Sequence, residues 1–194
     1  MPDVAKNQPL ATSKAVLTPT TVQKSAALPV DDSARLKEIR ALVAKNNQSS
    51  IDDDTIICQI YMESRFDAKA ESSESTARGL MQLLKGAVRE LYRIEDLSKP
   101  RAERSPETKL YLEADKFHDS PGFLDEATNI RAGTRYLELL IQRQKKNGAA
   151  DPIAEAYKKY RGRTDGRYYT KIKACADKLR AAPNSMQVLR DMAK

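Results

Sequence analysis

The segment from Ile56 to Glu63 constrains the fold of this chain most strongly, because it is an apolar stretch that ends on one carboxylate. Its large apolar side chains recur every three to four residues, at Ile56, Ile57, Ile60 and Tyr61. This spacing predicts the buried face of a helix. Glu63 then lies partly desolvated at the end of that face, and desolvation raises the pKa of a carboxyl group. We therefore predict that Glu63 holds a proton close to neutral pH, as a general acid does.

The composition favours one mainly α-helical domain. The chain has 194 residues, of which 40% are apolar, and this suffices for a single core of ordinary size. Charged residues make up 31%, glycines number 7, and tryptophan is absent. Such a profile favours helices over the turn-rich composition of a β-sandwich or barrel.

The ends of the chain differ from its middle. Residues 1–30 contain four prolines and no aromatic residue, so they cannot bury enough surface to fold, and we expect a disordered arm. A single folded domain is expected over residues 31–182, with an N-cap close to Ser33. Residues 183–194 are expected to form a C-terminal tail or a loosely attached short helix.

Start and stop signals predict the helices of the domain. Asp52, Asp53 and Asp54 precede the helix that leads to Glu63, where carboxylates favour the positive end of the helix dipole. We therefore expect these three residues to be caps and not metal ligands. Apolar periodicity predicts further helices over 81–94, 107–118 and 125–147, the last ended by a glycine, with two more after Pro152 and Gly166.

A compact motif, Gly79-Leu80-Met81-Gln82-Leu83, follows Glu63-Ser64 after a polar loop. In this order and at this spacing the two motifs resemble the lytic transglycosylases of the goose-type lysozyme-like (SLT) superfamily, bacterial enzymes that cut the glycan strands of peptidoglycan. The resemblance covers about residues 33–182 and implies a lysozyme-like helical fold. It continues through Asn129-Ile130, Gly133, Tyr136-Leu137, Ala156-Tyr157 and Tyr169.

The chain departs from the family pattern at one motif. Where the family has Ala-Tyr-Asn-x-Gly, this chain has Ala156-Tyr157-Lys158-Lys159-Tyr160. Lys158 replaces the asparagine and Tyr160 replaces the glycine, so the substrate contacts at this motif are altered.

The resemblance implies that Glu63 is the catalytic residue. It would protonate the glycosidic oxygen between N-acetylmuramic acid and N-acetylglucosamine and then accept the proton of the C6 hydroxyl, which closes a 1,6-anhydro ring without consuming water. Residues 95–125, the most polar part of the domain, are expected to border the glycan groove. The resemblance also implies a set of substrate-binding or site-orienting residues, namely Ser64, Met81, Gln82, Asn129, Tyr157 and Tyr169.

Each of these residues also has a purely structural alternative. Ser64 can end its helix by bonding to the local backbone. Met81 and Gln82 can pack at a helix start, and Asn129 can cap a helix. The two tyrosines can be ordinary buried residues that bond any nearby partner.

One carboxylate is obvious, whereas most glycosidases need two. Asp67 lies four residues after Glu63, but Phe66-Asp67-Ala68 is expected to turn away as a loop. Substrate-assisted enzymes escape the two-carboxylate rule, which suits a lytic transglycosylase. Two alternatives stay open: a lysozyme-like muramidase that hydrolyses the same bond, and a catalytically weak protein that binds peptidoglycan or an assembly partner.

Positive charge is concentrated near the C-terminus. The formal net charge is +7, and residues 158–180 contain nine Lys or Arg against Asp165 and Asp177. This segment is either a solvated helix face or a surface that attracts the anionic cell wall. Nucleic acid ranks last as a partner, because no nucleic-acid-binding motif accompanies the charge.

The sequence predicts neither a metal site nor a cofactor. His118 is the only histidine, which excludes a site built on several imidazoles, and we expect it on the surface at a helix end. Cys58 and Cys175 lie on apolar stretches, where cysteine behaves as a small hydrophobe, so two buried thiols are expected. One disulfide in an oxidising compartment remains the alternative.

The expected substrate lies outside the cytoplasm, so we expect the protein in the periplasm or secreted. No run of 18 apolar residues predicts a membrane span, and residues 1–30 lack the apolar core of a secretory signal. Either a signal has been removed or a specialised secretion machine delivers the protein. A wall-cutting protein delivered in this way would also need an inhibitor or immunity protein as a partner.

Overall fold

The computed structural model describes residues 33–194, so the expected arm over residues 1–30 lies outside the described residues. The described part is mainly α-helical, as predicted, and contains two isolated β-bridges and no strand. None of its helices is long and apolar enough to cross a membrane. The elements in order are α1 (Ser33–Asn46), α2 (Asp53–Ser64), α3 (Lys85–Leu97), η1 (Arg101–Glu103), α4 (Glu107–Asp119), η2 (Pro121–Leu124), α5 (Glu126–Lys146), α6 (Pro152–Arg161), α7 (Arg167–Ala181) and α8 (Met186–Met192).

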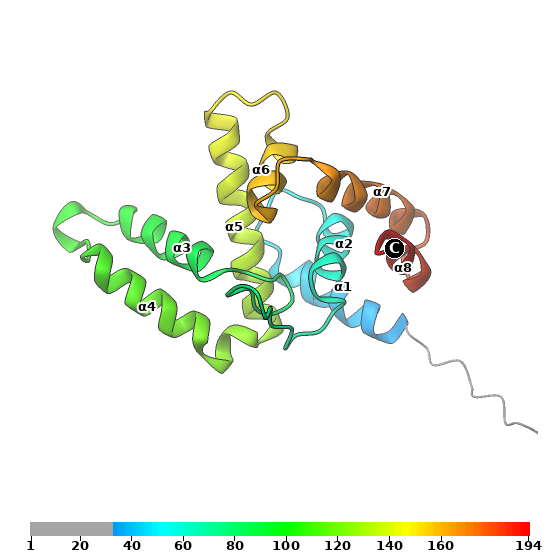
Figure 1. The fold of residues 1–194 in the computed structure, drawn as a ribbon, viewed down its shortest axis with the longest axis horizontal. Coiled ribbons are helices and arrows are strands. Elements are labelled where there is room, and N and C mark those ends of the chain that lie inside the picture. Colours follow the sequence, from blue (N-terminus) through cyan, green and yellow to red (C-terminus); the bar gives the residue numbers. More distant parts are fainter. Residues whose placement is uncertain (1–32) are drawn as a thin grey trace, which may run out of the picture. The chain divides into compact units, whose positions relative to one another are not determined.

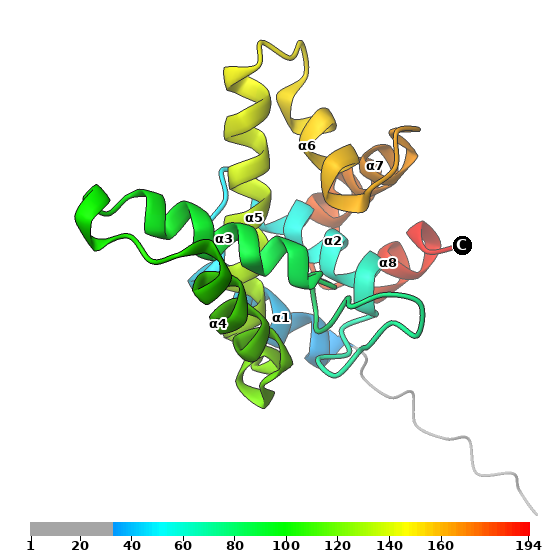
Figure 2. The same cartoon turned by 60° about the vertical axis from the view of Figure 1, so that its left-hand side comes forward.

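The long helix α5 is the central support of this domain. It packs against α1, α3 and α6, and Figures 1 and 2 show it running between the α3–α4 hairpin and the other helices. Its range agrees with the predicted helix over 125–147 within one residue. Its buried face consists of Asn129, Ile130, Gly133, Thr134, Leu137, Leu140 and Ile141.

Helix α2 lies in the core and carries Glu63 in its last turn. Asp52 caps its N-terminus by accepting a hydrogen bond from the Thr55 backbone N–H at 3.1 Å, which confirms the capping role predicted for this residue. Helices α1, α7 and α8 all contact α2. Because these helices surround it, α2 is buried on nearly all sides from Thr55 to Tyr61.

The chain leaves α2 abruptly after Ser64. Arg65 and Phe66 have φ angles of 56° and 68°, in the left-handed region that non-glycine residues rarely adopt. The Arg65 N–H bonds the Tyr61 carbonyl at 3.0 Å, and Arg35 donates to the Phe66 carbonyl at 3.0 Å from α1. These bonds hold a turn that ends the helix at Glu63-Ser64 and directs Asp67 to the exposed surface, as predicted.

The predicted helix over 81–94 begins four residues later, at Lys85. The backbone of Arg78 and Leu83 exchanges two hydrogen bonds of 3.2 Å, and the Gln82 N–H bonds the Gly79 carbonyl at 3.1 Å. These bonds close a tight turn over residues 78–83, with Gln82 at a φ of 47°. Since the turn already occupies these backbone groups, Met81 and Gln82 belong to a loop and not to the helix start.

Two predictions about individual segments are wrong. His118 is fully buried in the last turn of α4, where its Nε2 lies 3.1 Å from the Leu83 carbonyl oxygen and its ring lies 4.8 Å from that of Phe123. Its partner Leu83 lies 35 positions away in the sequence, so no local pattern could reveal this burial. The C-terminal helix α8 is also not loosely attached, because Leu189 is fully buried in the core.

Cys58 of α2 and Cys175 of α7 are free thiols buried in the core, as predicted. Their sulfur atoms lie 2.8 Å apart. They therefore bring α2, which carries Glu63, into contact with α7.

Candidate active site

Glu63 occupies the end of α2, facing the turn between α6 and α7 and the turn over residues 78–83. Its side chain is only 6% exposed. Two cavities nevertheless reach it. The first, here called the polar cavity, has a volume of about 400 Å³ and is lined by residues that include Ser72, Glu74, Gln82 and Tyr160. The second, here called the cationic cavity, has a volume of about 340 Å³ and is lined by residues that include Arg161, Arg163, Arg167, Tyr168 and Lys171.

A third cavity extends the groove beyond the polar cavity. It has a volume of about 220 Å³, and its lining is more apolar, with Leu83, Ala87 and Tyr136 among its residues. It shares Gln82 and Tyr160 with the polar cavity, and the polar cavity shares Glu63 with the cationic one. The three cavities therefore follow one another as a groove that passes the Glu63 carboxyl.

Two side chains from the α6–α7 region contact the Glu63 carboxyl. The Tyr168 hydroxyl, in the first turn of α7, donates a hydrogen bond to Glu63 Oε1. Arg161, the last residue of α6, places its Nη1 3.8 Å from Glu63 Oε2. The Arg161 guanidinium also lies over the Tyr168 ring, 5.8 Å from its centroid. The three residues form one contacting cluster at the meeting point of the polar and cationic cavities.

Burial raises the pKa of Glu63 above its ordinary value of 4.5. The hydrogen bond from Tyr168 and the charge of Arg161 lower it, but the effect of burial is larger. The position at the C-terminal end of a helix acts in the same direction as burial, because the negative end of the helix dipole disfavours a carboxylate. A glutamate in this setting can hold a proton and release it to a bound group.

The Gly79–Leu83 motif forms the floor beside Glu63, and Asn129 of α5 holds it in place. The fully buried Asn129 accepts a hydrogen bond from the Met81 N–H at 2.9 Å and donates to the carbonyls of Arg78 and Phe123, both at 3.3 Å. Gly79 has a φ of +77°, and a Cβ there would lie 2.3 Å from the Asn129 amide nitrogen. Only glycine therefore fits this contact.

Gln82 is the predicted binding residue that shares the polar cavity with Glu63. Its amide Nε2 donates to the carbonyls of Ala70 and Gly79, both at 3.0 Å. These two bonds tie the polar loop over residues 70–79 to the turn and fix the orientation of the amide. The side chain is thereby preorganised at the wall of the groove.

Tyr160, which stands where the family has glycine, is part of this wall. Its hydroxyl donates to the Met81 carbonyl at 2.9 Å, and its ring lies 5.7 Å from that of Tyr136. It thus joins α6 to the Gly79–Leu83 turn. The other departure, Lys158, pairs with Glu155 on its own helix at 2.6 Å and lines none of the three cavities.

The other predicted binding residues lie behind the groove. Ser64 bonds the Ile60 carbonyl at 3.1 Å, and Met81 is fully buried against Gly133 of α5. Tyr157 is fully buried and donates to Gln59 at 3.1 Å, and Tyr169 stacks on Tyr157 with ring centroids 4.6 Å apart. The structure therefore brings Glu63 and Gln82 together in one cavity, and it places Ser64, Met81, Asn129, Tyr157 and Tyr169 in the supporting layer.

Sequence reasoning missed Tyr168 and Arg161. Tyr168 adjoins the predicted Tyr169, but successive helical residues face different directions, and it is Tyr168 that faces Glu63. Arg161 is the last residue before Gly162, which ends α6 with a φ of 69°. Gly162 is therefore the local sequence feature that could have predicted a helix end at Arg161.

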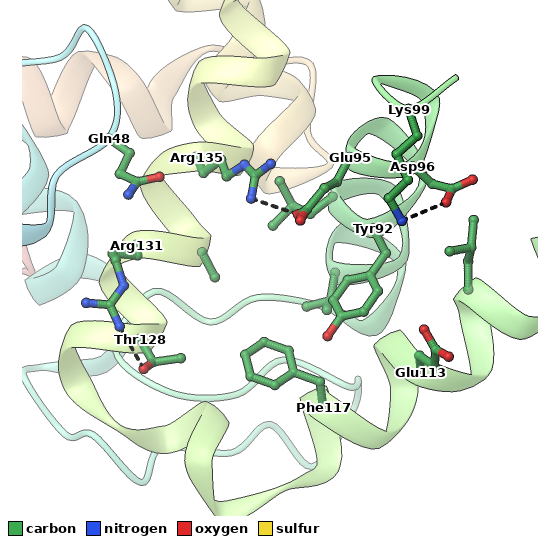
Figure 3. Close-up of a pocket in the computed structure, with 14 residues that line it drawn as sticks. Gln48, Tyr92, Glu95, Asp96, Lys99, Glu113, Phe117, Thr128, Arg131 and Arg135 are labelled. Carbon is green, nitrogen blue, oxygen red and sulfur yellow. Dashed lines mark hydrogen bonds and ion pairs between the residues drawn. The ribbon is translucent and has the colours of Figure 1, made fainter. Parts of the chain in front are cut away.

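Another cavity, of about 520 Å³, lies elsewhere, between α3, α4 and α5. Figure 3 shows Tyr92 and Phe117 at its apolar side, with Arg135 paired to Glu95 and Lys99 paired to Asp96, each at 3.1 Å. Part of the segment 95–125, which was expected to border the glycan groove, lines this cavity instead. Four of its charged residues form these two ion pairs, and none of the predicted site residues lies here.

No group of three or more metal-ligating side chains occurs among residues 33–194.

A helical domain whose groove passes one buried glutamate has the arrangement of a lysozyme-like, glycan-cleaving protein. The model of the transglycosylase SLT domain family matches residues 41–166, which is more than half of the chain. The chain therefore belongs to this family, and its function is of the lytic transglycosylase type, which acts on peptidoglycan. Neither the search of curated proteins nor the search of solved structures found a match.

The raised pKa of Glu63 predicts how stability depends on pH. Below pH 4 the carboxyl is protonated in the folded and the unfolded chain, so Glu63→Gln should leave the free energy of unfolding nearly unchanged. As the pH rises through the folded-state pKa, the unfolded chain releases the proton more readily, and wild type loses stability. Glu63→Gln should therefore become more stable than wild type toward neutral pH, as measured by urea unfolding from acid, below pH 4, to about pH 8.

Asp115→Asn is the matched control, because the hydrogen bond from Arg89 lowers the pKa of the Asp115 carboxyl. Its difference from wild type should have the opposite sign, with the variant less stable near neutral pH and the gap closing in acid. A Glu63→Gln variant that is less stable than wild type at pH 7 would contradict a buried carboxyl that favours its protonated form.

Proposed function

We propose that this protein is a peptidoglycan lytic transglycosylase that cleaves the β-1,4 bond between N-acetylmuramic acid and N-acetylglucosamine and leaves a 1,6-anhydro-muramoyl end. The observation that carries the proposal is the setting of Glu63, a single carboxyl with a 6% exposed side chain, beside two open cavities. The other carboxylates that line these cavities, Glu74 and Asp165, are exposed. One desolvated carboxyl suits a reaction in which acid and base act in succession.

In the first step Glu63 acts as the general acid. Its proton passes to the glycosidic oxygen as the bond from that oxygen to C1 of the muramoyl residue breaks. The carbonyl oxygen of the muramoyl N-acetyl group stabilises the positive charge that develops at C1, so no second protein carboxylate is required. Burial favours the protonated acid before the step, and Tyr168 and Arg161 stabilise the carboxylate after it.

In the second step the same carboxylate acts as the general base. It accepts the proton of the C6 hydroxyl while that oxygen forms a bond to C1, which closes the anhydro ring. Glu63 regains its proton and no water is consumed. The Tyr168 hydroxyl keeps the carboxylate oriented between the two steps through its hydrogen bond to Oε1.

The groove supports binding of an extended glycan strand. Gln82 offers a fixed amide beside Glu63, and Tyr160 and Tyr136 offer ring surfaces further along. Ser64, Met81, Asn129, Tyr157 and Tyr169 contribute by holding the helix end, the turn and the tyrosine layer in position. We therefore propose these five as positioning residues and Gln82 as the direct substrate contact.

Hydrolysis is the second candidate, and one observation favours it. Glu74 lines the polar cavity together with Glu63, and hydrolytic glycosidases use a second carboxylate as general base or nucleophile. A muramidase of this kind would use Glu74 to activate water or to attack the sugar.

Purified sacculi test the role of Glu63. Glu63→Gln and Glu63→Ala should lower the rate of sacculus solubilisation by at least about 100-fold, since general acid catalysis contributes about 10²- to 10⁴-fold. Circular dichroism and thermal unfolding should show that both variants remain folded. Undiminished solubilisation by either variant would reject Glu63 as the catalyst.

Mass spectrometry of the released fragments separates the two reactions. Transglycosylation leaves anhydro-muramoyl ends, whereas hydrolysis leaves reducing ends. Glu74→Gln is the matching variant, because it should retain most of the solubilisation rate in a transglycosylase and lose it in a hydrolase. Reducing ends together with an inactive Glu74→Gln variant would replace the first proposal by the second.

The same function bears on delivery and partners. Because peptidoglycan lies outside the cytoplasmic membrane, we propose action in the periplasm or after secretion, delivery by a specialised secretion machine, and a dedicated inhibitor or immunity protein. Fractionation of producer cells with and without such a machine tests the delivery. Equal export by cells that lack the machine would reject it.

A further inference from the structure

We propose that the cationic cavity beside Glu63 is a subsite for the free carboxylates of the peptide stem on the muramoyl residue next to the scissile bond. The inference rests on the proposed function and concerns its specificity. It would make the enzyme selective for strands that carry stems with free carboxylates over strands that lack stems or carry neutralised ones.

The charge of the cavity carries the first step of the argument. Four cationic side chains line it against the two carboxylates of Glu63 and Asp165. Glu63 faces Arg161, and Asp165 accepts a hydrogen bond from the Arg167 backbone N–H at 3.1 Å. Within residues 33–194, no ion pair engages Arg163, Arg167 or Lys171.

The position of these three cations carries the second step. Arg163 lies in the α6–α7 turn, and Arg167 and Lys171 lie one turn apart on the first part of α7, so the last two share a helix face. Tyr168, between them in sequence, bonds the Glu63 carboxyl. The cations therefore lie at the end of the groove that adjoins the reacting bond, where a group attached to the muramoyl residue would reach them.

The contrast along the groove carries the third step. The cavity farthest from this end is lined by Lys159 and Arg161 but also by Leu83, Ala87 and Tyr136, whose apolar surfaces suit the uncharged faces and acetyl groups of the sugars; the cationic cavity has four cations and lacks these apolar residues. Glycan sugars alone give no reason for unpaired cations at the other end. A peptide stem does, because it carries carboxylates, and arginine binds carboxylates through paired N–H donors.

Arg161 links this subsite to the catalytic group. Its guanidinium contacts Glu63 and lines both cavities that reach Glu63. A stem carboxylate bound in the cationic cavity would compete with Glu63 for this cation. Once Arg161 is drawn away, the Glu63 carboxyl loses a stabilising charge and favours its protonated form, which the first chemical step requires.

The test compares Arg163→Gln/Arg167→Gln with wild type on two substrates. The first is native sacculi, and the second is sacculi whose stem carboxylates have been amidated with carbodiimide and ammonia. On native sacculi the double variant should show kcat/KM roughly tenfold lower, the size expected for two partly exposed charge pairs. On amidated sacculi the variant and wild type should agree, and wild type itself should be slower than on native sacculi.

Lys173→Gln/Lys178→Gln is the matched control, since it removes the same charge from exposed positions of α7 that do not line the cavity. It should cleave native sacculi at the wild-type rate. The proposal would be overturned if the Arg163→Gln/Arg167→Gln variant lost the same fraction of kcat/KM on native and on amidated sacculi. It would also be overturned if wild type cleaved both kinds of sacculi at the same rate. A third outcome would also overturn it. If the Arg163→Gln/Arg167→Gln variant matches wild type only on sacculi from which hydrofluoric acid has removed the wall phosphate polymers, the cavity binds phosphate and not stem carboxylates.

Binding separates this proposal from the catalytic one. Co-sedimentation of the Glu63→Gln variant with native and amidated sacculi needs no turnover, and it should show weaker binding to the amidated form and weaker binding at high salt. If wild type cleaves neither substrate, the proposed function fails while this comparison still reports on the subsite. If wild type cleaves both equally and binds both equally, the subsite fails and the function stands.

A separate observation carries a second inference. Cys58 and Cys175 are the only cysteines in the chain, their sulfur atoms lie 2.8 Å apart, and they are separated by 117 residues. A disulfide needs a sulfur–sulfur separation of about 2.05 Å, which a small adjustment of two side chains supplies. We infer that these thiols form a disulfide when the protein folds in an oxidising compartment.

The bond would join α2, which carries Glu63, to α7, which carries Tyr168. In the reaction a disulfide of a thiol–disulfide oxidoreductase is reduced to two thiols, while Cys58 and Cys175 lose two hydrogens and form one sulfur–sulfur bond. Both thiols are buried in the folded chain, so the exchange must precede complete folding. The bond would then hold together the two helices that share the Glu63–Tyr168 hydrogen bond.

Refolding with oxidised glutathione tests this inference, and thiol titration of the denatured product should find no free thiol. Its melting temperature should exceed that of the reduced protein by roughly 5–15 °C, because the bond closes a long loop of the unfolded chain. The Cys58→Ser/Cys175→Ser variant should melt at the same temperature in both conditions. Two free thiols in the oxidised product, or an unchanged melting temperature, would overturn the inference.

Discussion

Desolvation of one carboxyl group is the constraint on which the arrangement of this site depends. The helix that carries Glu63 ends within two residues of it, at a left-handed turn held from α1, so the side chain faces a groove while its backbone stays in the core. Burial favours the protonated carboxyl, and Tyr168 and Arg161 limit the cost of the ionised form. A fully exposed glutamate would lack the first effect, and an isolated buried one would lack the second.

The second motif acts mainly as a scaffold for this group. Asn129, Gly79 and Gly133 let the Gly79–Leu83 turn lie directly on α5, and the turn presents the Gln82 amide to the groove. A methyl group at Gly133 would lie 2.8 Å from the Met81 Cβ, so the glycine sets the distance between turn and helix. The motif is thus a packing solution, and its polar residues are mostly used to hold the backbone.

One of the two departures from the family pattern, Tyr160, lines the groove, whereas the other, Lys158, does not. Tyr160 stands where the family pattern has glycine and bonds the Met81 carbonyl, while Arg161 and the cations after it line the cationic cavity beside Glu63. Cationic side chains are thus most numerous in the cavity at this end of the groove. An uncharged polymer would not use this concentration of charge, whereas a glycan with charged side branches would.

The sequence by itself determined the helical class, the ranges of α4 and α5 and the burial of Glu63, because these follow from local periodicity, capping residues and desolvation. Its two motifs also identified the family. Only the tertiary structure decided that Tyr168 and not Tyr169 contacts Glu63, that Met81 and Asn129 support the site from behind, and that His118 is buried. These facts depend on contacts between residues far apart in the chain, such as the 105 positions between Glu63 and Tyr168, which no local pattern encodes.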